Sequence, residues 1–209
     1  MKPSKLFYAL IAAIVLLHAA AATADAIDMD DPRRTVGRED NVRIDAQLVQ
    51  DTVSPGTPIG VAWQIENLSP APVAVASKVA GASYDEDSRT ITLTIGSEVP
   101  DDGKMPHIVT IAPGEKKVFR AAATPMLAGT AIRSPHSSPR YVQVKVSILR
   151  DVAAFSQISA EQTLSDQQFD QWFEANDTIL LNAVPVRFST RRSNSGFAPA
   201  DQRYANNGM

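Results

Sequence analysis

The sequence predicts an all-β protein folded as a two-sheet antiparallel sandwich of about seven strands, with one short helix before the last strand. Three observations favour this fold class. Apolar and polar residues alternate along several segments, which is the pattern of strands buried on one face. Proline and glycine turns separate these segments, and the chain contains 14 prolines, which helix interiors exclude. Valine and threonine, which favour strands, are abundant.

Residues 1–24 have the organisation of a secretory signal peptide. Two lysines precede an apolar run from Leu6 to Leu17, and small residues lead up to Ala24. We expect cleavage after Ala24 or, alternatively, after Ala26, and an uncleaved membrane anchor is the remaining alternative. The sequence therefore predicts a periplasmic or secreted protein that has no integral membrane span once the signal is removed.

The remaining chain is expected to hold one folded domain between two irregular ends. Residues 25–41 lack periodicity and are predicted to form a flexible leader. Residues 42–188 are predicted to form the sandwich domain. Residues 189–209, rich in Arg, Asn, Ser and Gly, are predicted to form a disordered tail.

The composition argues against several classes of function. After removal of the signal, 18 lysines and arginines stand against 23 aspartates and glutamates, which gives a net charge of -5. Such an acidic chain is a poor match for nucleic acid or for an anionic membrane surface. Because the chain has no cysteine, no disulfide supports the domain and no thiolate can bind a metal. We expect no cofactor and no transition-metal site.

Two strands near the start of the domain have the clearest alternation. Val42–Leu48 place their apolar side chains on one face, and Ile59–Glu66 do the same, with Trp63 directed into the core. Between them, Ser54–Gly56 reads Ser-Pro-Gly and predicts a turn, because proline presets φ and glycine permits a positive φ.

The later strands are predicted by the same alternation and by the turns that separate them. The strands are a segment that begins at Val73 and Val75, then Thr90–Ile95, Val109–Ile111, Val118–Phe119, Tyr141–Ile148 and finally Ile179–Phe188, which Pro185 places at a sheet edge. The turns are predicted at Asp85–Ser88, Pro100–Gly103 and Pro113–Gly114.

One helix is predicted near the end of the domain. Ser165 can cap its N-terminus, and Gln168 completes a capping box three residues later. Leu164 and Phe169 occupy the two positions of a hydrophobic staple. The apolar residues at helical spacing predict a single stripe that packs on the sandwich, formed by Phe169, Trp172 and Phe173.

Two segments of this pattern resemble bacterial immunoglobulin-like domains. They are T-V-S-P-G-T-P-I-G-V-A-W-Q-I-E-N-L-S at Thr52–Ser69 and V-T-I-A-P-G-E-K-K-V-F at Val109–Phe119. In such domains a P-G turn, a strand that ends in asparagine and a later A-P-G-E turn recur. The resemblance covers Val42–Leu149 and implies an immunoglobulin-like sandwich. The helix departs from this pattern, and because the fold hosts unrelated functions, the resemblance implies no particular activity.

The mature chain offers little for catalysis. His107 and His136 are its only histidines, and we expect both to face solvent or to be hydrogen-bonded. No G-x-S-x-G elbow and no glycine-rich phosphate loop occurs. The prediction is therefore a protein that is not an enzyme, with a divergent hydrolase as the alternative.

Two acidic clusters are the candidates for a calcium site, at Asp85–Asp87 and among the aspartates of Asp28–Asp31. Carboxylate oxygens suit calcium. Neither cluster has the D-x-D-x-D-G spacing of a calcium loop, so a solvated turn and a solvated leader are the favoured interpretations. No metal ligand is predicted.

Candidate binding residues lie in and around one loop. Arg133–Arg140 forms a proline-containing loop at an end of the predicted sandwich, where binding sites are common. A plain connection explains the same residues. The candidates are Arg133, His136 and Arg140 in the loop, and Tyr84 and Tyr141 for stacking on a ligand. Trp172 is expected to anchor the helix, with a sugar-stacking platform as the alternative.

Together these features predict an exported interaction or accessory module of the bacterial envelope, which binds a protein partner through loops or an edge strand. A periplasmic protease inhibitor or a pilus-type chaperone is the alternative, because strand addition uses main-chain hydrogen bonds and leaves no sequence motif. The partner and the oligomeric state do not follow from the sequence.

Overall fold

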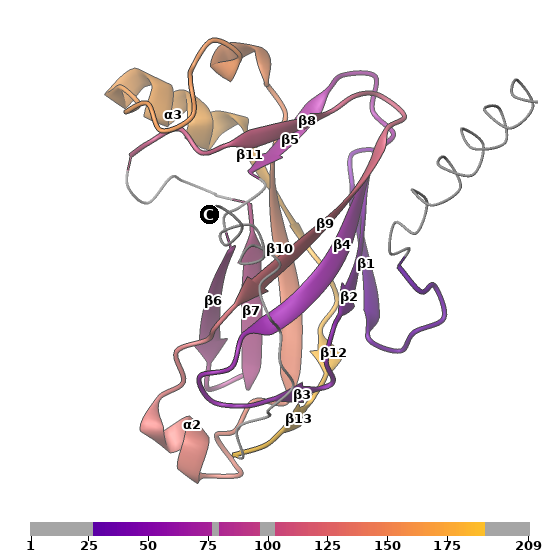
Figure 1. Ribbon diagram of the computed structural model, residues 1–209, viewed down its shortest axis with the longest axis vertical. Helices are drawn as coiled ribbons and strands as arrows, with labels where there is room; N and C mark the ends of the chain where they lie inside the picture. The colour runs from indigo at the N-terminus through magenta and orange to yellow at the C-terminus, as the bar shows by residue number, and fades with distance from the viewer. Residues whose placement is uncertain (1–26, 77–79, 97–102, 191–209) are drawn as a thin grey trace, which may run out of the picture.

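The computed structural model describes residues 27–76, 80–96 and 103–190. The predicted signal peptide, residues 191–209 of the predicted tail and residues 100–102 of one predicted turn lie outside the described residues. Within the described part the protein is mostly β-structure, which confirms the predicted all-β class (Figure 1). Among these residues, no helix has both the length and the apolar character needed to cross a membrane.

The first sheet has four strands in the order β1-β2-β4-β9, and all three of its pairs are antiparallel. The strands are β1 (Arg34–Glu39), β2 (Val42–Leu48), β4 (Ile59–Asn67) and β9 (Lys116–Ala123). This sheet contains the two strands with the clearest alternation in the sequence.

The second sheet is larger, and its strands follow the order β6-β7-β10-β5-β8. They are β6 (Ala80–Asp85), β7 (Thr90–Ile95), β10 (Tyr141–Leu149), β5 (Val73–Ala76) and β8 (Ile108–Ile111). Two more strands, β11 (Asn176–Leu180) and β12 (Val184–Pro185), also pair with β10. A third, two-stranded sheet joins β3 (Thr52–Val53) to β13 (Arg187–Phe188).

Three parts of the predicted sandwich need correction. There are three sheets in the described residues, not two. The pairing is not antiparallel throughout, because β7 pairs with β10 in parallel and β3 pairs with β13 in parallel. The single last strand predicted at Ile179–Phe188 is divided among β11, β12 and β13, because the chain leaves the large sheet after Pro185 and pairs with β3 from Arg187.

The main core lies between the sheets, and its four principal strands confirm the predicted alternation. Each inward side chain of β2, β4, β7 and β10 is at most 2% exposed, and these side chains are Val42, Ile44, Ala46, Leu48, Ile59, Val61, Trp63, Ile65, Ile91, Leu93, Ile95, Val142, Val144, Val146 and Ile148. Trp63 stacks on Phe119 of β9, with ring centroids 4.6 Å apart. Since burial of one large apolar side chain stabilises the fold by roughly 1.5–3 kcal/mol, burial of this set contributes strongly to the stability of the fold.

The predicted flexible leader is wrong for Arg34–Glu39, which form β1. A two-residue turn at Asp40 and Asn41 joins β1 to β2, and both residues have positive φ, 41° and 64°. Such a pair defines a hairpin turn whose twist matches that of the strands, and Asn and Asp tolerate this conformation best after glycine.

Strand β1 also brings the two large sheets together at one side of the sandwich. The Oγ1 of Thr35 donates a hydrogen bond to the carbonyl oxygen of Asn182 at 2.8 Å. A Cβ atom at Gly37 would lie 2.9 Å from Ile179 and 3.1 Å from Leu181, so only glycine permits this approach. The folded unit therefore includes the segment that precedes Val42.

Helix α3 (Asp166–Ala175) confirms the predicted capping box, because Ser165 and Gln168 each accept from the other's backbone N–H. It covers the outer face of β5, where a second core gathers Ala74, Met105, Leu149, Phe155, Leu164 and Trp172. Phe155 belongs to a short 3₁₀ helix, Ala153–Phe155, and meets Trp172 edge to face at 5.2 Å. The predicted stripe is wrong at Phe173, which is 67% exposed.

Both described proline-glycine turns form as predicted. The N–H of Thr57 donates to the carbonyl of Ser54 at 3.2 Å, and the N–H of Glu115 donates to that of Ala112 at 3.0 Å. In each turn the glycine, Gly56 or Gly114, has a positive φ, which is the reason that glycine follows proline there.

Candidate functional site

The predicted binding loop lies at the end of the sandwich that also holds α2 (Gly129–Arg133), β3 and β13 (Figure 1). Parallel pairing of β7 with β10 builds this site. Thr90, the first residue of β7, is the partner of Tyr141, the first residue of β10. Arg89 and Arg140, which precede those strands, therefore lie at the same end of the sheet. An antiparallel pair would have separated them by the length of a strand.

The loop between α2 and β10 is closed by its own hydrogen bonds around Ser134. The carbonyl oxygen of Ser134 accepts from the N–H of Ser137 at 3.1 Å and from the Oγ of Ser138 at 2.7 Å. Its Oγ accepts from the N–H of His136 at 3.2 Å. These bonds satisfy backbone groups that a disordered loop would leave to water, so the loop has a defined shape.

Arg89 fixes this loop to the sheet. Its Nε donates to the carbonyl of Ser138 at 2.8 Å, and its Nη2 donates to that of Pro135 at 2.5 Å. Its own carbonyl accepts from the N–H groups of Arg140 at 2.9 Å and Tyr141 at 3.3 Å. Arg89 also has a positive φ of 57°, a backbone conformation that other contacts must hold in a residue with a side chain.

Tyr84 supports the same loop from β6. Its hydroxyl donates to the carbonyl oxygen of Ser137, and its ring packs against the main core. Burial raises the pKa of this phenol above its usual value. The hydroxyl of Tyr84 is therefore engaged within the protein and its ring is partly buried, and stacking of Tyr84 on a ligand stays a prediction. Tyr141, in contrast, is 41% exposed.

A pocket of about 620 Å³ opens beside the loop. Three arginines line it, Arg89, Arg133 and Arg140, and no aspartate or glutamate is among its described lining residues. Its apolar wall consists of Ile132, Pro135, Pro139, Val186 and Phe188. Val186 is held beside Arg140, because its N–H donates to the Arg140 carbonyl at 2.8 Å. The site thus combines a cationic rim with an apolar surface.

The structure brings together some of the predicted site residues and not others. Arg133 and Arg140 share the pocket. His136 is exposed on the loop but does not line the pocket. Arg89, which also lines the pocket, was not among the predicted site residues. The available signal was its place as the single cation of an otherwise acidic turn that leads into a strand.

The two histidines do not share a site. His136 follows α2 at one end of the sandwich, and His107 precedes β8, which lies toward the other end (Figure 1). His107 lines a second pocket of about 320 Å³ beside β8, together with apolar residues that include Ile108, Phe155 and Ile158.

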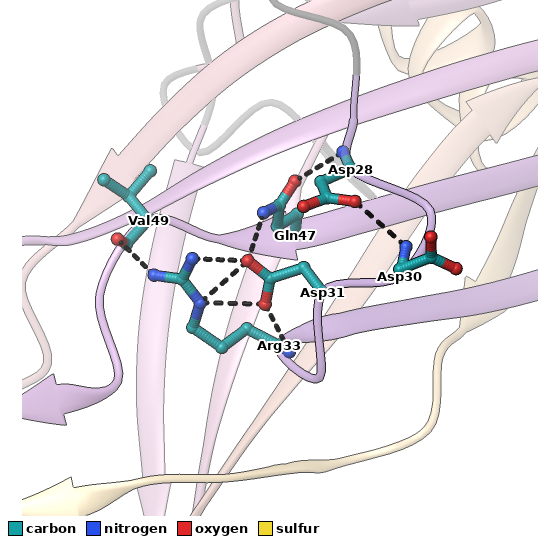
Figure 2. Close-up of polar contacts among 6 residues, drawn as sticks. All are labelled: Asp28, Asp30, Asp31, Arg33, Gln47 and Val49. Carbon is teal, nitrogen blue, oxygen red and sulfur yellow. Dashed lines mark hydrogen bonds and ion pairs between the residues drawn. The ribbon is translucent and has the colours of Figure 1, made fainter.

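The carboxylates of Asp28 and Asp31 accept hydrogen bonds from groups of the protein (Figure 2). The Asp31 carboxylate accepts from the backbone N–H and guanidinium of Arg33, and from the Gln47 amide at 2.7 Å. These hydrogen bonds, those from Arg33 above all, hold the pKa of Asp31 well below its usual range. Arg33 also donates to the carbonyl of Val49 at 3.0 Å. The cluster thus ties the chain before β1 to β2 through Asp31, while the Asp28 carboxylate accepts from the N–H of Asp30 at 3.0 Å.

The acidic turn between β6 and β7 is organised by Asp85. Its carboxylate accepts from the Oγ of Ser88 at 2.6 Å and from the N–H of Asp87 at 3.0 Å, and these bonds lower the pKa of Asp85. Within the described ranges, no group of three or more His, Cys, Asp or Glu side chains is placed to hold a metal ion.

Comparison of the chain with models of protein families, with curated proteins and with solved structures found no match in any of the three.

Proposed function

We propose that this protein is an exported, non-enzymatic interaction module of the bacterial envelope that binds a protein partner through the end of its sandwich. One observation carries the proposal. Arg89 and Tyr84 fix the loop of residues 134–140 by hydrogen bonds to its carbonyl groups. Arg133, Arg140 and Tyr141 remain exposed beside it. Arginine and tyrosine are enriched among the residues that dominate binding energy in protein interfaces.

The fixed conformation of this loop favours a role in binding over a role as a simple connection between α2 and β10. Association is weakened by the entropy lost when loops and side chains become ordered, and a loop that is already fixed loses less. Hydrogen bonds from Arg89 and within the loop fix its backbone before any partner arrives. The proposed export follows from the signal-like organisation of residues 1–24.

The proposal is tested by capture of partners from an envelope extract on the immobilised processed chain, with cross-linking and quantitative mass spectrometry. The loop variant carries Arg133→Ser and Arg140→Ser. The matched control carries Arg38→Ser and Lys116→Ser, which remove two cations from the first sheet. We expect a protein that the native chain and the control capture equally and the loop variant captures about tenfold less. A captured set that does not differ between the two variants would contradict the proposal.

Strand addition is the second candidate, favoured by the sheet edge at β8. In the described residues β8 pairs with β5 alone, and the 320 Å³ pocket beside it is lined mainly by apolar residues. An added strand would bond to the edge while one of its side chains enters the pocket. The tests are inhibition of a panel of proteases and rescue of the folding of a pilus subunit. Either activity, if the native chain shows it and Ile108→Pro loses it, would favour this inhibitor or chaperone function over loop binding.

The divergent hydrolase is the remaining alternative. Substrate turnover by the processed chain that His107→Ala or His136→Ala abolishes would establish it and overturn the non-enzymatic proposal.

A further inference from the structure

The charge of the arginine pocket is opposite to that of the chain as a whole. The chain without residues 1–24 has a net charge of -5, yet the described lining of the pocket contains three arginines and no carboxylate. Arg133 and Arg140 have no ion pair within the described residues. Glu86 shares a neighbouring pocket with Arg133 but does not line this one. Three like charges that line one pocket repel one another, so an anion bound among them would relieve that repulsion.

The three arginines also present hydrogen-bond donors. Arg89 uses its Nε and Nη2 on the carbonyls of Ser138 and Pro135, which fixes the plane of its guanidinium. A guanidinium carries five N–H donors, so further donors remain. A planar fork of donors matches the two oxygens of a carboxylate and gives hydrogen bonds about twice as strong as neutral ones.

The apolar wall of the pocket restricts the class of anion that would fit it. Ile132, Val186 and Phe188 line the same pocket as the arginines, and both Val186 and Phe188 are partly exposed. A small inorganic anion would contact the arginines alone and leave this wall in water. A ligand that carries an apolar group beside its charge would bury the wall as well, and removal of that apolar surface from water would strengthen binding.

We infer that this pocket binds a carboxylate of the partner protein that lies next to an apolar side chain. The inference deepens the proposed function and rests on it for the nature of the partner. Two sources present this chemistry: the C-terminus of a chain that ends in an apolar residue, and an aspartate or glutamate within an apolar segment. The pocket volume of about 620 Å³ is within the range of sites that hold small ligands or a few residues.

Binding of short peptides to the isotope-labelled processed chain tests this inference, followed through the backbone amide shifts of Arg140, Val186 and Phe188. The first probe is a mixture of pentapeptides with free C-termini that end in Leu, Ile, Val or Phe. The second is the same mixture with amidated C-termini. The third is amidated and carries one internal glutamate. Inorganic phosphate is the fourth probe.

We expect saturable shifts with the first or the third probe and none with the second. The responding probe identifies the source of the carboxylate. We expect Arg140→Gln to weaken this binding about ten- to a hundredfold, the effect of losing a charge-assisted hydrogen bond, and Arg38→Gln to leave it unchanged.

Three results would overturn the inference: equal binding of the second probe, equal affinity in Arg140→Gln, or binding of phosphate as tight as that of the peptides. Absence of binding by every peptide would also overturn it. The proposed function would still stand if capture of a protein partner depended on Arg133 and Arg140 while no peptide carboxylate bound. It would fail, together with this inference, if capture did not depend on them.

Discussion

Asn67 is a buried residue whose hydrogen bonds join distant parts of the chain. It ends β4 and is fully buried. Its Nδ2 donates to the carbonyls of Ala71 at 2.8 Å and Ile111 at 3.0 Å, and its Oδ1 accepts from the N–H and Oγ of Ser69. Its backbone N–H donates to Glu115 at 3.0 Å. It therefore connects the two segments that resemble immunoglobulin-like domains, and that resemblance stays a prediction.

We expect Asn67→Ala to lower the free energy of unfolding by about 2–4 kcal/mol, because the change leaves the buried carbonyl of Ile111 and partly buried groups of Ser69 and Ala71 without these partners. Chemical denaturation of the processed chain measures this loss. Asn182→Ala is the matched control, since the Asn182 side chain is exposed, and we expect a change within about 0.5 kcal/mol. Equal effects of the two substitutions would contradict the role given to Asn67.

Arg89 illustrates why a site residue can escape sequence analysis. Its positive φ of 57° costs roughly 1–2 kcal/mol in a residue with a side chain. Contacts with a loop about fifty residues later offset that cost: Arg89 donates to Ser138 and accepts from Arg140. Because these contacts are absent from the local sequence, the backbone conformation of Arg89 could not be predicted from its neighbours, whose acidic turn indicated only that the cation is unusual there.

At the scale of elements, α3 shows the limit of a helical pattern. Successive residues of a helix lie about 100° apart, so neighbouring aromatic residues cannot face the same point. Trp172 is 1% exposed and contacts Phe155, whereas Phe173 is 67% exposed. Capping was predictable because its rules concern residues three apart in sequence. Which aromatic residue the sheet covers depends on how the helix lies on β5.

We expect Trp172→Ala to destabilise the protein by about 3–5 kcal/mol, the cost of removing a large buried aromatic side chain. Phe173→Ala is the matched substitution on the same helix, and we expect it to change stability by less than about 0.5 kcal/mol because its ring faces water. Thermal and urea unfolding of both variants measure these effects. A larger loss in Phe173→Ala than in Trp172→Ala would show that α3 packs with its other face.

The strands that the sequence predicts and those it misses differ in what faces the core. Strands β2, β4, β7 and β10 carry apolar residues at every second position, and these residues are buried. Strand β1 has no such pattern, because its inward positions are occupied by Thr35 and Gly37, and Glu39, the next residue of that face, is exposed. Gly37 is required there by the side chains of β11, which come from a distant part of the sequence. The Asp40-Asn41 pair was the local signal for this hairpin.

At the scale of the molecule, strand direction decides where the site is built. Alternation of apolar residues predicts that a segment is a strand but not which way it runs beside its neighbour. The parallel pairing of β7 and β10 places Arg89 beside Arg140. The return of the chain through β12 then adds Val186 to the same end. The pocket is thus a product of topology, so the sequence could nominate Arg133 and Arg140 but not the site they share with Arg89.

The pairing of β7 with β10 can be measured directly by disulfide formation, because the chain has no cysteine of its own. Thr90→Cys with Tyr141→Cys would join partners of the parallel register. Thr90→Cys with Lys145→Cys would form a disulfide only if the two strands were antiparallel. In the parallel register, Lys145 lies four residues beyond the partner of Thr90, which is about 13 Å along β10. Alkylation of the remaining thiols and mass spectrometry report each bond. We predict rapid closure of the first pair and none of the second, and closure of the second pair alone would contradict the parallel arrangement on which the pocket depends.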